Sequence, residues 1–483
     1  MNRQRFTTLN SISHIWETLK LPKEALGSLH LVEDGDFLPS SFKLGHLAQA
    51  SIALSALTAS LFWSARTSSP VPRVTISMKH ACVEFSSDRL CTLNSKRLGP
   101  ALPPIGGLHK TADGYVRMHD SFLNHRVSAL KILGLQDGAN REEVAAKMLE
   151  WKSVELESAA FENGAVIVAL RSFDEWDALP QAKAVVDFPI TVRKINTALS
   201  HVPPSSAPLL KDKCLRGIRV VEMSRVISAP VAGKTLAAHG ADVIWVTSPT
   251  LPDLPEIDRD MARGKRTVQL DIKKAEDKEK LIELLRTAHV FISSYRPGSL
   301  AAQGLSAEEL TKINPNLIVA TLNAWGENGP WSMNRGFDSL VQAASGINVA
   351  EAESYGEGEP ARVLPTQALD HGSGYLLATG IMAALYEREL YGGAYEVHVS
   401  LAGVMKYLRS LGRFPGKDGF ERKSVNNLEH VEKIMETRGT EFGELRAVKH
   451  TAVIEGVDVG WEIMPKPLGS DEAAWLSYRN FLR

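Results

Sequence analysis

Short apolar strands alternate with helical segments between residues 218 and 322, and this alternation constrains the fold more than any other feature. Apolar runs of strand length lie at 218–223, 243–246, 267–270, 290–293 and 317–322. Segments of helical length lie between them, at 230–239, 276–287 and 307–313. Strands separated by helices at this spacing form parallel sheets with helices on both faces. The sequence therefore predicts an α/β fold with a doubly wound, mostly parallel sheet, and ligands should bind at the carboxyl ends of its strands.

Changes in composition and pattern divide the rest of the chain. Its 483 residues suggest two or three domains. We predict an N-terminal extension at 1–39, a helix–strand unit with a small α+β domain at 40–199, a Pro- and Ser-rich linker at 200–212, a large domain at 213–410, and a C-terminal tail at 411–483.

A helix–strand unit occurs twice. In the segment 369–403, an uncharged helix ends near Gly392 and is followed by a strand at 395–401. The segment 44–78 follows the same plan, with Leu-x-His at its start and an alternating strand at its end. Gly45 stands in the first copy where the second has Asp370. This difference predicts that the first copy is structural and that the second carries chemistry.

Asp370 has two interpretations that this stretch alone leaves open. The residue stands at the start of a buried helix, where an aspartate often serves only as an N-cap. Alternatively, the first-turn N–H groups would keep the carboxylate ionised, and Gly372 and Gly374 would let a ligand approach the backbone closely. An ionised, accessible aspartate can act as a nucleophile or a base.

Composition excludes several classes of partner. The 55 basic and 56 acidic residues nearly balance, so we expect neither nucleic acid nor a membrane as partner. Three irregularly spaced cysteines favour a reducing compartment and predict neither a disulfide framework nor a Cys-based zinc site, and we expect no metal ligands elsewhere. We expect a cytoplasmic protein; Arg3 and Arg5 leave a mitochondrial presequence as the alternative, which Glu17 opposes. The uncharged run at 48–65 contains many hydroxyl groups, which favours a buried helix over a membrane span.

For two further local patterns we expect no catalytic role. The segment 228–235 nearly matches a phosphate-binding P-loop, but Ser228 replaces the first glycine and Pro230 removes an N–H group. We therefore expect no nucleotide hydrolysis, although the helix start could face a cofactor phosphate. In the small domain, His119, Asp120 and His125 are expected to be solvated loop residues.

A series of ordered motifs makes the chain similar to a known family. The motifs lie at 219–225 with Ala229 and Pro230, then at 239–244, 263–273, 295–298, 314–315, 326–330, 336–338 and 345–346, and end with the Asp370 stretch. Over residues 215–410 they resemble the class III CoA-transferase family, which includes formyl-CoA transferases and alpha-methylacyl-CoA racemases. The segment 113–184 resembles the family's small domain but precedes the large one, so the chain looks like a rearranged or fused two-part version.

This resemblance implies an activity of the EC 2.8.3 type and a set of site residues. CoA would move from an acyl-CoA donor to a carboxylic acid acceptor, with Asp370 as the nucleophile that forms an aspartyl anhydride and then an enzyme–CoA thioester. The family uses no permanently bound cofactor and forms dimers, so the resemblance implies a homodimer with CoA esters as substrates. By family position, the CoA contacts would be Arg225, Val226, Ile227, Ser228, Ala229, Leu270, Lys273, Ser294, Tyr295, Arg296 and Asn323. Two positions depart from the family, since Thr247-Ser248 replaces a usual acidic–basic pair and Ala302 a usual arginine.

Two alternatives remain. The family's racemases pair the aspartate with a histidine from a Gly-His-Asp segment, but here the segment is Gly336-Phe337-Asp338, and Phe337 cannot shuttle a proton. Transfer is therefore favoured over racemisation. The rearranged order also leaves a non-catalytic CoA-binding or scaffold protein as a third interpretation.

Overall fold

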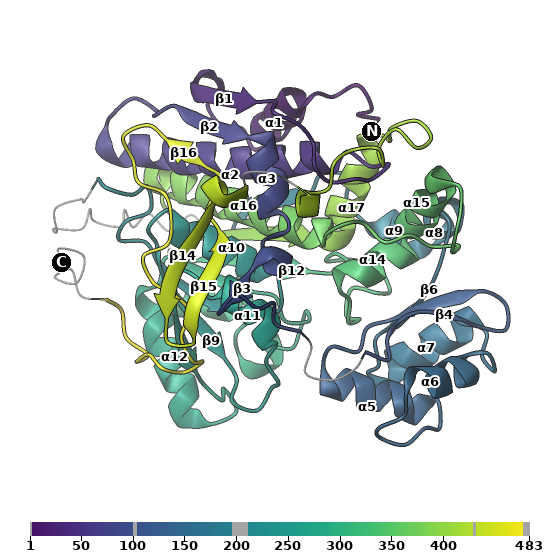
Figure 1. Ribbon diagram of the computed structural model, residues 1–483. Helices are drawn as coiled ribbons and strands as arrows, with labels where there is room; N and C mark the ends of the chain where they lie inside the picture. The colour runs from purple at the N-terminus through teal and green to yellow at the C-terminus, as the bar shows by residue number, and fades with distance from the viewer. Residues whose placement is uncertain (1, 100–103, 196–210, 428–430, 477–483) are drawn as a thin grey trace.

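A seven-stranded sheet forms the centre of the computed structural model, which describes residues 2–99, 104–195, 211–427 and 431–476 (Figure 1). Its order is β10 (Lys265–Gln269), β9 (Asp242–Thr247), β8 (Arg219–Met223), β11 (Val290–Ser293), β12 (Ile318–Asn323), β13 (Tyr395–Ser400) and β7 (Ile190–Lys194). The first six strands are parallel, and β7 pairs antiparallel with β13 at one edge. The predicted doubly wound, mostly parallel sheet is confirmed.

The order of the strands reverses between β8 and β11. From β8 the chain builds outward through β9 to β10, and from β11 it builds the other way through β12 to β13. Crevices at such a reversal bind ligands in open α/β sheets, because the loops after the two central strands diverge there. The loops that follow β8 and β11 contain several of the predicted CoA contacts.

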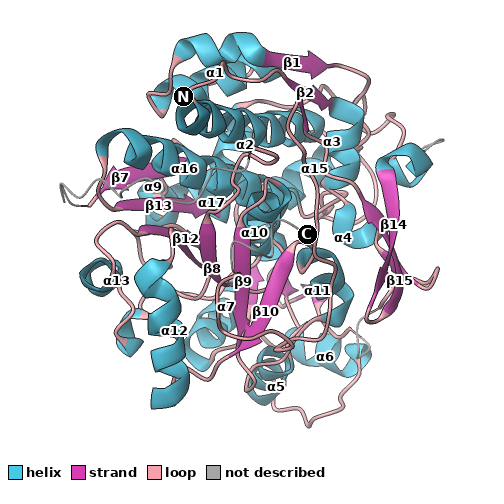
Figure 2. Cartoon of the chain, turned by 90° about the vertical axis from the view of Figure 1, so that its left-hand side faces the viewer, coloured by secondary structure: helices cyan, strands magenta, loops and turns pink. Residues whose placement is uncertain are grey.

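Helices cover both faces of the sheet, as the alternation of buried side chains requires (Figure 2). Val220 of β8 packs on the side of α10 (Ser228–Ala238) and α16 (Ala368–Tyr391). Its neighbour Val221 packs on the opposite side, which α12 (Ala275–Thr287) and α13 (Ala307–Ile313) cover. Short helices α11 (Pro255–Met261), α14 (Asp338–Ala344) and α15 (Ile347–Tyr355), which the sequence pattern did not indicate, lie in the connections.

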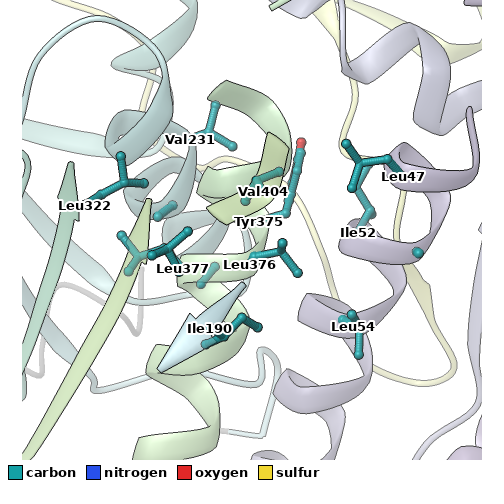
Figure 3. Packing of buried hydrophobic residues seen from close by; sticks show 14 of the residues in the cluster. Leu47, Ile52, Leu54, Ile190, Val231, Leu322, Tyr375, Leu376, Leu377 and Val404 are labelled. Carbon is teal, nitrogen blue, oxygen red and sulfur yellow. The ribbon is translucent and has the colours of Figure 1, made fainter. Parts of the chain in front are cut away.

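Helix α16 lies between the sheet and a second long helix, α2 (Leu44–Thr67) (Figure 3). Both helices have 24 residues and are largely buried. Figure 3 shows α2 side chains on one side of α16, and side chains of the sheet on the other: Leu47, Ile52 and Leu54 against Ile190 and Leu322. Helix α2 is apolar and long enough to cross a membrane, but 89% of its most apolar window is buried inside the protein. It therefore serves as a core helix.

The predicted duplication is visible in space. After α2 the chain forms β2 (Val74–Ser77) and α3 (Met78–Glu84), and after α16 it forms β13 and α17 (Leu401–Ser410). A serine ends each strand and caps the next helix, with Ser77 accepting from His80 N–H and Ser400 from Gly403 N–H. Each strand has a parallel neighbour and an antiparallel one: β1 (Leu29–Val32) and β16 (Val453–Ile454) flank β2, whereas β12 and β7 flank β13.

The segments outside the two copies form smaller layers. Strands β4 (Gly107–Lys110), β5 (Tyr115–Met118) and β6 (Ile167–Ala169) form an antiparallel sheet with helices α5 (Leu123–Ile132), α6 (Arg141–Met148) and α7 (Ser153–Asn163). Figure 1 shows this small domain beside the main body. Helices α8 (Phe173–Ala178) and α9 (Pro180–Ala184) then lead into β7. At the chain start, α1 (Thr8–Thr18) packs on α2.

The tail lies against the main body. Strands β14 (Met435–Thr440) and β15 (Gly443–Val448) form a sheet with β3 (Thr92–Leu93), which follows α4 (Ser87–Leu90). Beyond that sheet, Trp461 donates a hydrogen bond from its indole N–H to the Lys234 carbonyl. Most of the predicted linker at 200–212 lies outside the described residues.

Candidate functional site

A narrow pocket opens at the carboxyl ends of β8, β9 and β11, where the order of the strands reverses. Its empty space, counted together with the open solvent at its mouth, is about 350 Å³, and its walls come from several parts of the chain. Phe122 belongs to the small domain, Trp245 to β9, Tyr295 to the loop after β11, and Leu468 to the tail. Aromatic walls beside a cation, Arg225, suit a flat ring with a nearby negative charge.

The loop after β8 forms the floor of the pocket. The Arg225 guanidinium lies 4.1 Å from the centre of the Phe122 ring and donates to the Pro252 carbonyl. Val226 has a φ of 70°, in the left-handed region that β-branched residues rarely adopt. Such strain costs on the order of 1–3 kcal/mol and is concentrated at functional sites. The surrounding structure thus forces this loop into an unfavourable conformation next to the pocket.

Asp258 is a buried acid in the wall of the same pocket. One of its oxygens accepts a hydrogen bond from Leu254 N–H at 3.0 Å. Burial raises the pKa of this carboxyl group to about 7, although Arg225 and Arg259 partly oppose that shift. Near neutral pH the pocket wall therefore contains a carboxyl group that can both donate and accept hydrogen bonds.

Asp370 lies beneath this loop, in the first turn of α16. The helix begins after Gln367, and no side-chain hydrogen bond caps it, so the simple N-cap interpretation of Asp370 is wrong. Its backbone is held at both ends, because its N–H donates to Asp338 Oδ2 at 2.9 Å and its carbonyl accepts from Ser228 Oγ at 3.2 Å. Among the described residues, no hydrogen bond reaches its carboxylate oxygens, and the residue is only 6% exposed.

The two glycines near Asp370 make room for protein rather than for a ligand, which corrects the sequence-based interpretation. A Cβ atom at Gly374 would lie 2.4 Å from the Ser228 carbonyl oxygen and 2.6 Å from Val231 Cβ. A Cβ at Gly372 would lie 3.2 Å from Leu47 of α2. Gly374 therefore lets α16 approach α10, which brings the Arg225–Ser228 loop close to Asp370.

The electrostatic environment of Asp370 also differs from the prediction. We expected the helix start to keep the carboxylate ionised, but burial and the neighbouring Asp338 and Asp88 carboxylates raise its pKa well above the ordinary value. Asp338 is fully buried, and burial raises its pKa to about 6 despite hydrogen bonds from Asp370 N–H and Gln342. Asp338 and Asp370 therefore form a coupled acidic pair that resists double ionisation.

The small domain brings the half-buried His119 and the buried His125 close to Phe337, next to this pair. The His119 ring stacks on Phe337, the residue before Asp338, with centroids 3.9 Å apart. The His125 ring lies 5.8 Å from Phe337. The expectation of solvated loop residues is wrong for both, because burial lowers the pKa of His119 to about 4 and of His125 to about 3. The charges of Arg225, Arg296 and Arg335 further lower the pKa of His125, which places a basic cluster at this domain boundary.

The structure brings together only part of the predicted contact set. Arg225, Val226 and Tyr295 line the pocket, and Ser228 joins their loop to Asp370. Ile227 and Ala229 are buried at the start of α10, Ser294 donates its N–H to Met223, and Arg296 is exposed.

Three predicted contacts lie elsewhere. Leu270 packs in the core beneath α12, and Lys273 is exposed beyond β10. Asn323 bonds to His398 and to Gly326 N–H, so its side chain is occupied by protein groups. None of these three lines the pocket.

The near P-loop is not a phosphate cradle. Lys234 is 1% exposed and forms an ion pair with Asp260 at 2.8 Å, which keeps its ammonium group inside the protein. Thr235 Oγ1 donates to the Val231 carbonyl of its own helix. The expectation that this segment does not hydrolyse nucleotides is consistent with these inward-facing groups.

Sequence reasoning missed several residues of the site. Phe122, Trp245, Asp258 and Leu468 line the pocket from distant segments, and Asp88 approaches Asp370 from the first copy. Asp338 appeared only as part of a motif. The Phe337-Asp338 pair directly before a helix was the one signal that could have marked it.

Comparison with known proteins finds relatives of the large domain. Residues 215–412 match the sequence model of CoA-transferase family III. An acyl-CoA transferase of Gibberella moniliformis is 30% identical over 310 residues, covering 61% of this chain and 54% of the relative. The probable fatty acyl-CoA transferase Rv3272 of Mycobacterium tuberculosis is 35% identical over 214 residues, covering 42% of this chain and 53% of the relative.

A formyl-CoA:oxalate CoA-transferase of Rhodopseudomonas palustris is 34% identical over 210 residues, covering 41% of this chain and 48% of the relative. The chain thus spans about half the length of the curated relatives it matches. A crystal structure of Rv3272 is 33% identical and covers 41% of this chain and 57% of that one, with a TM-score of 0.38. The part of the chain that is similar to CoA-transferase family III, residues 215–412, includes strands β8 to β13 and the helix that carries Asp370.

Proposed function

We propose that the protein transfers CoA from an acyl-CoA donor to a carboxylic acid acceptor, with Asp370 as the covalent nucleophile. The observation that carries this proposal is the Asp370 carboxylate, which is held by its backbone at two points but is not engaged by any hydrogen bond from the described residues. A buried structural acid would be paired, since an unpaired buried carboxylate is costly. A carboxylate kept unpaired next to the loop that lines a pocket suits a chemical role.

The chemistry needs only the carboxylate and the two substrates. An Asp370 oxygen attacks the thioester carbonyl carbon, the C–S bond breaks, and CoA leaves as the thiolate. The thiolate then attacks the aspartyl carbonyl of the mixed anhydride, releasing the donor acid and leaving CoA as a thioester on Asp370. The acceptor carboxylate repeats both steps in reverse order, which returns the free Asp370 carboxylate.

The pocket supports a place for the nucleotide end of CoA. Its aromatic walls suit the adenine ring, and Arg225 suits a phosphate nearby. The loop 225–228 connects this pocket to Asp370, so the thioester arm would pass along the loop toward the acidic pair. Strain at Val226 suits a loop that shifts when the arm enters.

A transfer assay tests this function. The protein is incubated with a panel of CoA esters and carboxylic acids, and new CoA esters are identified by mass spectrometry. We expect new esters with ping-pong kinetics; their absence across the panel would favour the scaffold interpretation. Exchange of solvent deuterium into the alpha carbon of a recovered CoA ester, without a new ester, would instead indicate a racemase in which an imidazole such as His119 replaces the missing one at position 337. Assembly as a homodimer and a cytoplasmic location stay predictions.

A further inference from the structure

The two helix–strand copies exchange segments. After α3 of the first copy, residues 85–89 cross to the start of α16 in the second, where the Phe85 carbonyl accepts a hydrogen bond from Thr366 Oγ1. After α17 of the second copy, the chain crosses to the start of α2, where Phe414 N–H donates to the Ser41 carbonyl at 2.7 Å. Each copy therefore completes the surroundings of the other's long helix.

The start of each long helix also has its own buried acid. Asp338 accepts a hydrogen bond from Asp370 N–H at the start of α16. Asp36 lies against Gly45 at the start of α2, where its side chain is 13% exposed and its Cγ would lie 2.4 Å from a Cβ at Gly45. Burial raises the pKa of both acids.

The crossing segments bring opposite charges to the starts of the two helices. At α2, the crossing segment supplies Arg422, whose guanidinium lies 2.5 Å from Asp36 and neutralises it. At α16, the crossing segment supplies another acid, Asp88, whose charge raises the pKa of Asp370. Adding a third carboxylate to an acidic pair is unfavourable for folding, so this placement needs a different reason.

Asp88 has one partner that links it to the nucleophile. Its Oδ1 lies 3.1 Å from Nε2 of His371, the residue that follows Asp370. The His371 side chain is fully buried and stacks on Phe85, with ring centroids 5.5 Å apart. Its other nitrogen, Nδ1, has no partner among the described residues, so Asp88 is the group that fixes the ring through a hydrogen bond.

The crossing segment is itself held firmly. Ser87 Oγ donates to Asp260 Oδ2 at 2.7 Å, and Asp260 is also paired with Lys234. The Asp88 side chain is 9% exposed, so this position is not a free surface residue. An anchored acid can orient a histidine more precisely than a mobile one.

We propose that Asp88, supplied by the first copy, is a positioning residue for Asp370 that acts through His371. This inference rests on the proposed function, because it assigns the first copy a task in the reaction of the second. Asp88 fixes the His371 ring and with it the first turn of α16, where the Asp370 backbone is held by Asp338 and Ser228. The charged and titratable groups around Asp370 are then Asp338 from α14, Asp88 from α4 and its own neighbour His371, with Arg117 of β5 acting on Asp338.

The test compares two variants at Asp88 with a matched variant of the first copy. Asp88→Ala leaves both His371 nitrogens unpartnered, and Asp88→Asn keeps an oxygen acceptor but removes the charge. The control is Ser11→Ala, because Ser11 Oγ lies 2.7 Å from Nε2 of His46, the matching histidine of the first copy. Each protein is assayed for the rate at which hydroxylamine-sensitive CoA ester forms on the chain, across pH, and for its unfolding temperature.

We expect Asp88→Ala to slow ester formation about tenfold, with the KM for acyl-CoA within about twofold of the parent value. Asp88→Asn should keep most of the maximal rate, and its acid limb should move to lower pH because a charge that opposes Asp370 ionisation is gone. Ser11→Ala should change neither.

An unchanged rate in Asp88→Ala together with an unchanged acid limb in Asp88→Asn would overturn the proposal. Equal losses in Ser11→Ala would also overturn it, by showing a general packing effect. Asp88→Asn keeps the test valid if the alanine variant unfolds. A parent protein that forms no CoA ester would instead contradict the proposed function.

Discussion

The start of α2 and the start of α16 share one structural arrangement but differ in how their acidic groups are neutralised. Each 24-residue helix receives a crossing segment, is followed by a strand that ends in a capping serine, and has an aspartate against its first turn. At α2, the Asp36 carboxylate fills the space beside Gly45 and is neutralised by Arg422. At α16, Asp370 adds a second carboxylate that no cation neutralises among the described contacts. The first copy shows that this arrangement folds without a second carboxylate. The unneutralised Asp370 of the second copy therefore calls for a chemical explanation.

The largest expected effect comes from the acid that distinguishes the second copy. Asp370→Asn should lower the transfer rate by at least about 10³-fold, because the amide cannot form the anhydride. Asp36→Asn provides the matched variant in the first copy and should retain transfer activity. Steady-state assays of both proteins check this comparison, and an active Asp370→Asn protein would contradict it.

The next variant, Gly45→Asp, introduces into the first copy the aspartate that distinguishes the second. A Cβ at Gly45 would lie 2.4 Å from Asp36 Cγ, so Gly45→Asp should clash with a buried, paired carboxylate. We expect a loss of about 3–5 kcal/mol in unfolding free energy and no additional CoA ester on the chain. Gly27→Asp is the control, since no atom lies within 4 Å of a Cβ there. Denaturant unfolding and adduct counting measure both, and a second ester per chain would show that the copies are equivalent.

A pair of glycines tests how closely α16 must approach α10. Gly374→Ala should destabilise the protein by about 1–3 kcal/mol and slow transfer, because its methyl group would press on the Ser228 carbonyl and displace the loop. Gly372→Ala meets side-chain methyl groups, Leu47 Cδ2 at 3.2 Å and Val404 Cγ1 at 3.4 Å, and should cost less than about 1 kcal/mol. Unfolding curves and kcat values give the comparison; equal effects at the two sites would show that the loop contact does not matter.

The smallest effect concerns the coupled acids. Because burial and Asp338 raise the pKa of Asp370, the transfer rate should rise with pH as the pair loses its last proton. Asp338→Asn removes the charge that opposes ionisation, so the acid limb should move to lower pH by about one unit. A pH–rate profile of kcat/KM checks the sign, and a shift to higher pH would mean that Asp338 supports ionisation of Asp370 rather than opposing it.

The sequence predicted the elements whose signals are local. The strands at 290–293 and the helix at 307–313 match the structure at both ends, since buried β-branched runs and amphipathic periodicity are short-range patterns. The repeated helix–strand unit was also visible in the sequence, because matching residues stand at corresponding positions of the two copies. By contrast, α17 was missed, since its start at Leu401 continued the apolar alternation of β13.

The site was harder to predict because its partners come from distant segments. Asp370 was found through its position, but the direction of its pKa shift depends on Asp338 and Asp88, which lie 32 and 282 residues away along the chain. The role of Gly374 likewise depends on where α10 lies. Leu270 and Asn323 were assigned by family position, whereas the structure places one in the core and bonds the other to His398.

The central claim is that Asp370, and no acid of the first copy, becomes covalently modified during the reaction. The most direct measurement is to mix the protein with acyl-CoA, trap with hydroxylamine or borohydride, digest with trypsin, and locate the modification by mass spectrometry. Trypsin separates the second-copy peptide 363–388, which contains Asp370, from the first-copy peptides 24–43 and 80–89, which contain Asp36 and Asp88. The account predicts a modification at Asp370 in peptide 363–388 only. A modification elsewhere, or none in a protein that still transfers CoA, would contradict it.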